Sequence, residues 1–243
     1  MRPVNSGDVV AANREARHEF VSHVSHELRV PMTSIMGYTD LLIKGIVGPL
    51  NEQQLNFLKI IRGNVERMAG LISSLSDLSG LDTGTLTLTM GPVSLPAVIT
   101  DVASYLQPLF VEKNQTLAVT LPPDLPPLQA DSRRLGQVLT SLLHNANRYT
   151  PTGGSIQLQA AAVGELVRIE VSDNGVGISL QDQPHIFEQF FRSEHPQVRE
   201  QPGWGLSLSV CQRLTEQMGG VLGFTSQPEA GSTFWLTLLS GKN

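Results

Sequence analysis

Residues 20–31 read FVSHVSHELRVP, with two histidines three positions apart and an acidic residue directly after the second one. Apolar residues recur about one helical turn apart through this stretch. From residue 9 to about residue 44, proline and glycine occur only at Pro31 and Gly37. This pattern predicts one long helix that carries both histidines.

A second helix is expected after a short turn. Residues 45–51 contain two glycines and a proline, and Asn51 is a suitable N-cap. Beyond it, apolar residues alternate in steps of three and four until the pattern fades at residues 79–80. The seam that they form consists of Leu58, Ile61, Val65, Met68, Ile72 and Leu75. The two helices should therefore form a hairpin.

Such a hairpin, about 70 residues long, has too little core to be stable alone. Its apolar stripes can be buried when two copies pair into a four-helix bundle, so we expect a homodimer. Packing of the same helices on the rest of the chain is the alternative.

The sequence pattern changes after Gly84, where short segments of alternating apolar and polar residues are mixed with helical stretches. This mixture is typical of an α/β domain. The proline-rich residues 122–127 predict a loop, because proline lacks a donor for strand pairing. Strands are expected over residues 117–121, 156–159, 166–171 and 233–238. The whole chain should thus contain an N-terminal signal-entry helix or linker (1–17), a hairpin domain (18–84) and an α/β domain (85–243).

The composition is ordinary for a soluble protein, with 40% hydrophobic residues, 16% charged residues and a net charge of -5. This charge gives no basic footprint for nucleic acid, so we expect no nucleic-acid partner. No apolar run reaches the roughly 18 residues that span a bilayer. The single cysteine, Cys211, cannot form an internal disulfide. We therefore expect a cytoplasmic protein, although residues 1–17 could equally be the cut end of a longer chain.

A helix predicted over residues 132–149 has an apolar stripe and an ordered polar face. The polar face carries Ser141, Asn145, Arg148 and Tyr149 at positions i, i+4, i+7 and i+8. An asparagine oxygen beside a basic residue suits a Mg²⁺-phosphate group, because Mg²⁺ prefers hard oxygen ligands. A solvated helix face is the alternative interpretation.

Two glycine-containing stretches follow. Residues 173–178 read DNGVGI after a predicted strand; their glycines let the backbone approach a ligand, and Asp173 can accept a hydrogen bond from an amino group such as that of adenine. Residues 203–208 read GWGLSL and open a helix, whose free N–H groups can hold phosphate. Neither spacing is that of a Rossmann site or a P-loop. The polar residues 193–202 between them are interpreted as a mobile lid, or else as a long surface loop.

Six short stretches occur in order along the chain: FVSHVSHELRVP, LTSLLHNANRYTP, DNGVGI, IFEQFFR, GWGLSL and GSTF. Together they resemble the H, N, G1, F, G2 and G3 boxes of the sensor histidine kinases of two-component systems, over roughly residues 15–240. The resemblance implies an α plus α/β fold: a histidine-phosphotransfer hairpin of the HisKA type, dimerising into a four-helix bundle, then an ATP-binding α/β sandwich of the GHKL type, as in Hsp90 and MutL.

The resemblance also implies the chemistry. His26, followed by Glu27, matches the phosphoacceptor, whereas His23 falls on a position without a role in the motif. Glu27 would act as base and orienter of the ring, since an adjacent carboxylate can hold the proton on its other nitrogen. Pro31 would bend the helix locally, a flexibility that signal transmission could use. The phosphoryl group would pass from ATP to His26 and then to an aspartate of a response regulator.

The nucleotide site follows from the same boxes. Asn145 would bind Mg²⁺, and Arg192 would assist the transferring phosphate. Asp173 would accept from the adenine amino group, so GTP should be rejected. The predicted nucleotide-binding residues are Asn145, Arg148, Tyr149, Asp173, Gly175, Gly177, Gly203, Gly205, Leu206, Ser207 and Thr233. Besides a second copy and a response regulator, the family resemblance implies an upstream sensory domain.

Three positions depart from the family pattern. Ser141 replaces the first asparagine of the N box, and Ser207 replaces the third glycine of the G2 box. Val30 stands where the family has a threonine or asparagine that places the water for dephosphorylation of the regulator, so we expect weak phosphatase activity. Ser141 and Ser207 leave a second hypothesis open, a nucleotide-binding pseudokinase that serves as a dimeric scaffold. An Hsp90- or MutL-like ATPase would not explain the His-Glu pair on a hairpin.

Overall fold

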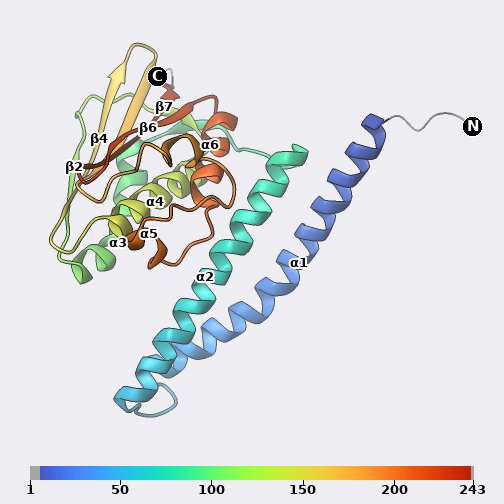
Figure 1. Ribbon diagram of the computed structural model, residues 1–243, viewed down its shortest axis with the longest axis vertical. Helices are drawn as coiled ribbons and strands as arrows, with labels where there is room; N and C mark the ends of the chain where they lie inside the picture. Colours follow the sequence, from blue (N-terminus) through green and yellow to red (C-terminus); the bar gives the residue numbers. More distant parts are fainter. Residues whose placement is uncertain (1–5, 242–243) are drawn as a thin grey trace, which may run out of the picture. The chain divides into compact units, whose positions relative to one another are not determined.

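The computed structural model describes the backbone of residues 6–241 and the side chains of residues 20–241. The chain divides into two compact units, residues 1–86 and residues 87–243. The first is a helical hairpin and the second is built of a sheet and helices (Figure 1). The predicted order of a hairpin followed by an α/β domain is therefore confirmed. In the described part of the chain, no helix has both the length and the apolar character to cross a bilayer.

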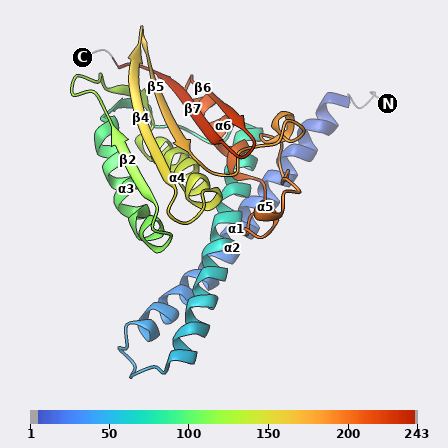
Figure 2. The same cartoon turned by 60° about the vertical axis from the view of Figure 1, so that its left-hand side comes forward.

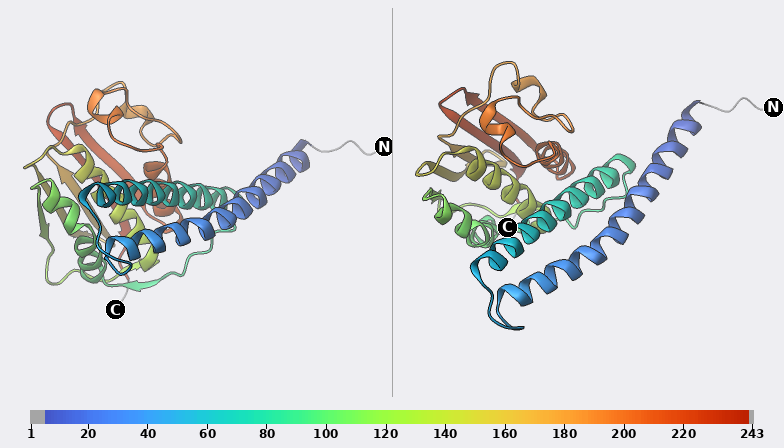
Figure 3. Two further views of the ribbon diagram at one scale, coloured as in Figure 1. Left: turned by 90° about the horizontal axis from the view of Figure 1, so that it is seen from below. Right: turned by 60° about the horizontal axis from the view of Figure 1, so that its bottom comes forward.

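The hairpin consists of α1 (Ser6–Ile43) and α2 (Glu52–Thr83), which run side by side (Figure 3). Asn51 begins α2 as predicted: its side chain accepts from N of Gln54 at 2.8 Å, and the Gln54 side chain accepts from N of Asn51 at 2.9 Å. The predicted end at residues 79–80 is wrong, because the helix continues to Thr83. Gly84 ends it in a left-handed conformation, with φ of 69°.

Two apolar stripes run along the hairpin. Met32 of α1 packs with Val65 and Ile72 of α2 in a small buried core. The seam predicted on α2 is thus divided, because Ile61 and Met68 remain 42% and 46% exposed. Leu28 and Ile35 of α1, which lie seven positions apart and so on one face of that helix, are exposed as well. We use the name outer stripe for five exposed apolar residues of the two helices: Leu28, Ile35, Phe57, Ile61 and Met68.

The second unit has a five-stranded sheet with helices on one face (Figure 2). The order of strands is β2-β4-β5-β7-β6; β2 and β4 are parallel and the other neighbours antiparallel. The strands are β2 (Thr116–Thr120), β4 (Ser155–Val163), β5 (Leu166–Asp173), β6 (Val221–Gln227) and β7 (Gly231–Leu239). The helices on the sheet are α3 (Leu95–Glu112), α4 (Ser132–Tyr149) and α6 (Ser207–Gln217), and a small second sheet pairs β1 (Gly91–Val93) with β3 (Leu128–Ala130).

Alternation along the central strands separates the two faces of the sheet. Ile169 of β5 and Leu236 of β7 are buried on the face that the helices cover, whereas Arg168 and Trp235 lie on the other face. The apolar stripe predicted on α4 supplies the helical side of this core: Leu135, Val138, Leu139, Leu142 and Ala146 are all buried. The polar face of α4 is consequently left for other contacts.

Candidate functional site

His26 lies on α1 with its ring open to solvent. The side chains of His26 and Glu27 are 74% and 67% exposed, and Nδ1 of His26 lies 3.8 Å from Oε1 of Glu27. The carboxylate can therefore interact with Nδ1, while Nε2 stays open to a reactant. Pro31 lies inside α1 without ending it. The first unit thus presents an accessible imidazole with a carboxylate beside it.

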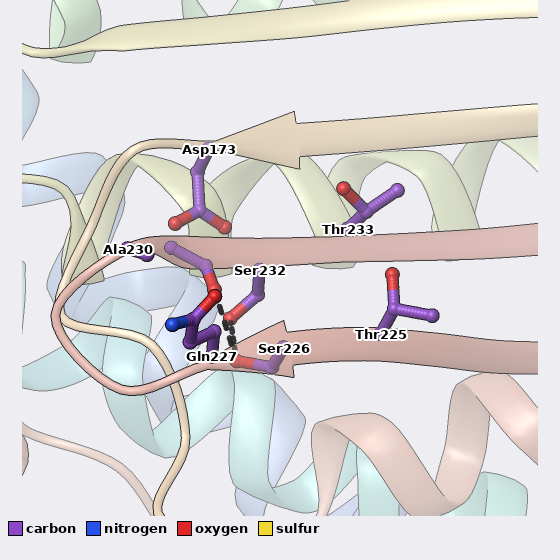
Figure 4. Close-up of a pocket in the computed structure, with 8 residues that line it drawn as sticks. Asp173, Thr225, Ser226, Gln227, Ala230, Ser232 and Thr233 are labelled. Atoms are coloured by element: carbon purple, nitrogen blue, oxygen red, sulfur yellow. Dashed lines mark hydrogen bonds between the residues drawn. The ribbon is translucent and has the colours of Figure 1, made fainter.

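Asp173 ends β5 and points toward the start of β7 (Figure 4). Its Oδ1 accepts from N of Gly175 at 2.9 Å, and the carboxylate also accepts from the backbone N–H of Ser232. Burial raises the pKa of Asp173 above its ordinary value, although both N–H groups oppose this rise. The surrounding pocket, of about 380 Å³, is lined by Asp173, Thr225, Ser226, Gln227, Ala230, Gly231, Ser232 and Thr233.

The register of β5 and β7 changes one expectation in this pocket. Asp173 pairs with Ser232, so both lie on the face that the helices cover. Thr233 lies on the opposite face, where its hydroxyl is 2.8 Å from that of Ser172. Ser232, which the sequence reasoning missed, is therefore better placed than Thr233 to accompany Asp173. The period of two along a strand is the signal that could have found it.

The DNGVGI stretch lies between the end of α4 and the end of β6. N of Val176 donates to the carbonyl oxygen of Tyr149 at 3.2 Å. Gly177 has φ of 66°, and a side chain there would collide with the carbonyl oxygen of Gln227. Glycine is required at this position for both reasons. These contacts bring the predicted G1 box beside the polar end of α4.

The polar face of α4 holds Asn145 and Arg148 half-buried. The side chain of Asn145 makes no hydrogen bond within the described part of the chain, unlike that of Asn147, whose Nδ2 donates to Oε1 of Gln115 at 2.7 Å. Asn147 is therefore structural, whereas Asn145 is available to a ligand.

A metal ion at Asn145 would need further ligands. Among the residues that the structure describes, no group of three or more histidine, cysteine, aspartate or glutamate side chains is arranged to hold a metal. Phosphate oxygens of a nucleotide would have to complete its shell, which fits Mg²⁺.

The two serines that depart from the family pattern have different surroundings. Ser141 hydrogen-bonds to the thiol of buried Cys211 on α6, and burial raises the pKa of that thiol to about 11. Ser207 is the exposed first residue of α6, and no side chain caps this helix at Leu206. In contrast, the hydroxyl of Ser209 donates to the carbonyl oxygen of Leu206 at 2.9 Å. Ser207 is thus the serine that can face a ligand at the start of α6.

The predicted lid, residues 193–202, contains the short helix α5 (Pro196–Arg199). Phe190, just before it, donates its backbone N–H to the carbonyl oxygen of Gly205 at 2.9 Å. Gly205 has φ of 68°, and a side chain there would strike the carbonyl oxygen of Phe191. The exposed Arg192 directs its guanidinium at the backbone carbonyl oxygens of Val198, Gln201 and Gly203.

Comparison with known proteins agrees with this division of the chain. Residues 16–84 match the family model described as His Kinase A (phospho-acceptor) domain. Residues 130–242 match that of the histidine kinase-, DNA gyrase B- and HSP90-like ATPases. The chain belongs to the sensor histidine kinases.

Relatives of this histidine kinase chain are longer proteins. It is 35% identical over 228 residues to the sensor histidine kinase GacS of Pseudomonas protegens, which covers 91% of this chain and 24% of the relative. It is 34% identical over 230 residues to the circadian input-output histidine kinase CikA of Synechococcus elongatus, covering 92% and 30%. The chain therefore spans about a quarter to a third of the length of these relatives.

Solved structures share the fold of the histidine kinase chain. The crystal structure of full-length ShkA in complex with AMPPNP has a TM-score of 0.74 at 27% identity, covering 93% of this chain and 47% of that one. The histidine kinase AdeS of Acinetobacter baumannii has a TM-score of 0.63 at 24% identity, covering 89% and 98%.

His144, directly before Asn145 in this histidine kinase, is a further residue that the sequence reasoning missed. Burial lowers its pKa from 6.5 to about 4, and the positive charges of Arg148 and Lys113 add to the effect. The position of His144 inside the N box is the sequence feature that could have pointed to it. The ring is neutral at pH 7 and lies one helical turn before Arg148 on α4.

The depressed pKa of His144 predicts a pH-dependent stability. The unfolded state binds this proton below pH 6.5 and the folded state only below about pH 4, so stability is complete above 6.5 and is lost as pH falls between these values. The free energy of unfolding should fall by on the order of 3 kcal/mol over this range of pH. Urea unfolding at several pH values should show a smaller loss for His144→Gln, whereas the exposed His185→Gln should behave as wild type. An equal dependence of the free energy of unfolding on pH in wild type and in His144→Gln would contradict the prediction.

Proposed function

We propose that this chain is an ATP-dependent protein-histidine kinase that phosphorylates itself on His26. The observation that carries the proposal is the exposed ring of His26 with the Glu27 carboxylate 3.8 Å from Nδ1. Nε2 attacks the γ-phosphorus of ATP, the bond from phosphorus to the bridging oxygen breaks, and ADP leaves with the electron pair. Glu27 stabilises the positive charge that develops on the ring and takes the Nδ1 proton.

The second unit is the proposed ATP-binding part. Asp173 accepts from the adenine amino group, and Arg148 and the glycines of residues 203–205 lie at the phosphates. Asn145 is the proposed ligand of Mg²⁺, which when bound neutralises phosphate charge. Support comes from the ATPase family model and from the similar structure in complex with AMPPNP. The other proposed nucleotide contacts are Tyr149, Gly175, Gly177, Leu206 and Ser207, with Ser232 in place of Thr233 because Thr233 lies on the opposite face of the sheet.

The experiment that separates this kinase from a nucleotide-binding scaffold combines binding with labelling. ATP affinity is measured by calorimetry, and γ-labelled ATP with Mg²⁺ is then supplied to the same preparation. A kinase gains label that acid removes and base does not, whereas a scaffold binds ATP and stays unlabelled. The relatives GacS, CikA and BarA carry the name of histidine kinases, and none of these names favours the scaffold.

We also propose that the chain functions as a homodimer through the outer stripe of the hairpin. Its five residues are apolar and exposed, and a hairpin of this size gains a core when two copies pack together. The match to the His Kinase A domain supports this arrangement. Phosphoryl transfer within one copy and between two copies are both compatible with it.

If the outer stripe forms the dimer interface, a charged side chain placed there should strongly weaken dimerisation. The double variant Ile61→Glu and Met68→Glu should raise the dissociation constant of the dimer by about 100-fold or more, because buried carboxylates lack partners. Lys59→Glu, an exposed position away from the stripe, is the matched control. Sedimentation equilibrium measures both. A double variant that remains dimeric at wild-type concentrations would contradict the proposal.

The proposed acceptor after His26 is an aspartate of a response regulator. Val30, one turn after His26, is 60% exposed and has no hydrogen-bonding group to orient water. The next hydroxyls are turned to the helix itself: Thr33 donates to the carbonyl oxygen of Arg29 at 2.8 Å, and Ser34 to that of Val30 at 3.3 Å. We therefore propose that the protein is a weak phosphatase.

Val30→Thr should create phosphatase activity, because its hydroxyl can place the attacking water. We expect release of phosphate from a phosphorylated regulator to rise about tenfold, the worth of roughly one hydrogen bond. Val30→Ala removes bulk without adding a hydroxyl and should stay at the wild-type rate. The assay follows regulator label without ADP; rapid wild-type dephosphorylation would sink the prediction.

A cytoplasmic location and an upstream sensory domain complete the proposal. Cys211 is a free, buried thiol, which fits a reducing compartment, and ATP is available there. The relatives extend well beyond the matched region, which leaves room for a sensory part.

A further inference from the structure

Arg192 is exposed, yet three of its five N–H donors are used on the backbone of the lid region. Nη1 donates to the carbonyl oxygen of Gly203 at 2.9 Å. Nη2 donates to those of Val198 at 2.8 Å and Gln201 at 2.5 Å. Because these hydrogen bonds involve a cation, each is stronger than a neutral one. One side chain thus fixes the course of residues 198–203.

The ends of the lid are held by other groups. At its start, the hydroxyl of Ser193 donates to Oδ2 of Asp182 at 2.6 Å. After its end, the carbonyl oxygen of Gly205 accepts from N of Phe190 at 2.9 Å. Arg192 acts between these two anchors, on the part of the lid that neither of them fixes.

The carbonyl that Arg192 holds belongs to a residue beside the polar face of α4. A Cβ at Gly203 would lie 3.3 Å from Nη1 of Arg148, so the backbone of the G2 glycines approaches that guanidinium closely. The hold of Arg192 on Gly203 therefore sets where the start of α6 lies relative to Arg148. Both are on the side of the site that we assign to phosphate.

We propose that Arg192 is a positioning residue that shapes the phosphate side of the site before nucleotide binds. It holds the glycine stretch at residues 203–205 beside Arg148 through its hydrogen bonds to the carbonyl oxygens of Val198, Gln201 and Gly203. The inference rests on the proposed function, since the site that it shapes is that for ATP. It differs from direct action of Arg192 on the transferring phosphate.

Hydrogen exchange of the nucleotide-free full chain tests this inference, followed in peptides that cover residues 193–206. In Arg192→Gln, exchange of the lid should become about tenfold faster, because the backbone there opens more often. ATP should bind about tenfold more weakly, while adenosine, which has no phosphate, should bind as before. Arg192→Lys should partly restore both the slow lid exchange and the ATP affinity, since an ammonium group has three donors. Arg192 is exposed, so neither substitution should unfold the chain.

Arg199→Gln is the matched control, because it removes a positive charge from the same lid. The Arg199 side chain pairs with Oε1 of Glu194 at 2.7 Å and not with backbone carbonyls. Arg199→Gln should show wild-type hydrogen exchange in the lid peptides. An equal acceleration of lid exchange in Arg199→Gln and in Arg192→Gln would overturn the inference. Unchanged lid exchange in Arg192→Gln together with lost phosphoryl transfer would also overturn it, in favour of direct action. A wild-type protein that binds no ATP would refute the proposed function, whereas faster lid exchange in Arg192→Gln would still support the hold on the lid.

Discussion

His26→Ala should abolish the label that the chain takes from γ-labelled ATP, a loss of at least about 1000-fold. The reason is that the imidazole is the nucleophile, and an alanine methyl cannot form a bond to phosphorus. The side chain of His26 is 74% exposed, so the substitution should leave the hairpin folded. Gel-resolved incorporation at neutral pH, with ATP affinity measured in parallel, checks both expectations.

The neighbouring histidine provides the matched control. His23 is exposed on the same helix, three residues before His26. His23→Ala should retain label at the wild-type rate within about twofold, because this ring has no role in the transfer. If His23→Ala loses the label and His26→Ala keeps it, the assignment of the nucleophile is wrong.

Asp173→Asn should weaken ATP binding by about 10- to 100-fold, the cost of replacing a charged hydrogen-bond acceptor at the adenine amino group. The amide oxygen of asparagine can still accept from Gly175 and Ser232, so the end of β5 should keep its shape. Its amide nitrogen, however, meets the adenine amino group with donor against donor. Calorimetry with ATP and with GTP should show that the preference for ATP becomes smaller.

The control for Asp173 is Asp124→Asn, which removes the same charge from an exposed position between β2 and β3. This variant should bind ATP as wild type. Wild-type ATP affinity in Asp173→Asn would contradict the placement of adenine at this carboxylate, even if the protein remains a kinase.

Much of the fold could be predicted because its signals are local. The helix over residues 132–149 has the bounds of α4, since its apolar stripe is complete and Asp131 caps it by accepting from N of Arg134 at 3.0 Å. Likewise Asn51 begins α2. Strands β1, β3 and β6 are not among the predicted ones, because β1 and β3 have only three residues each, with Pro92 in β1, and Gly223 interrupts β6.

The strand β6 forms because of its partner. It pairs with β7 along its whole length, and the ring of Trp235 lies where a side chain at Gly223 would be. Gly223 and Trp235 lie on the two strands of one hairpin, so the pattern within β6 alone does not contain this contact.

The same limit applies to the site. The six boxes identify stretches, but which side chain of a stretch faces the ligand depends on register and loop course. Ser232, and not Thr233, lies opposite Asp173 because β7 pairs with β5 in that register. Similarly, the hydrogen bonds from Arg192 to three carbonyl oxygens depend on the path of residues 198–203, which the local sequence pattern does not specify.

The most direct test of the central claim is to locate the phosphoryl group on the chain. The full chain is incubated with ATP and Mg²⁺ and digested with trypsin, and the peptide between Arg17 and Arg29 is sequenced by mass spectrometry at neutral pH. We predict the phosphoryl group on His26, stable in base and lost in acid. A phosphoryl group on His23 or on a serine, or none on a protein that binds ATP, would contradict the account.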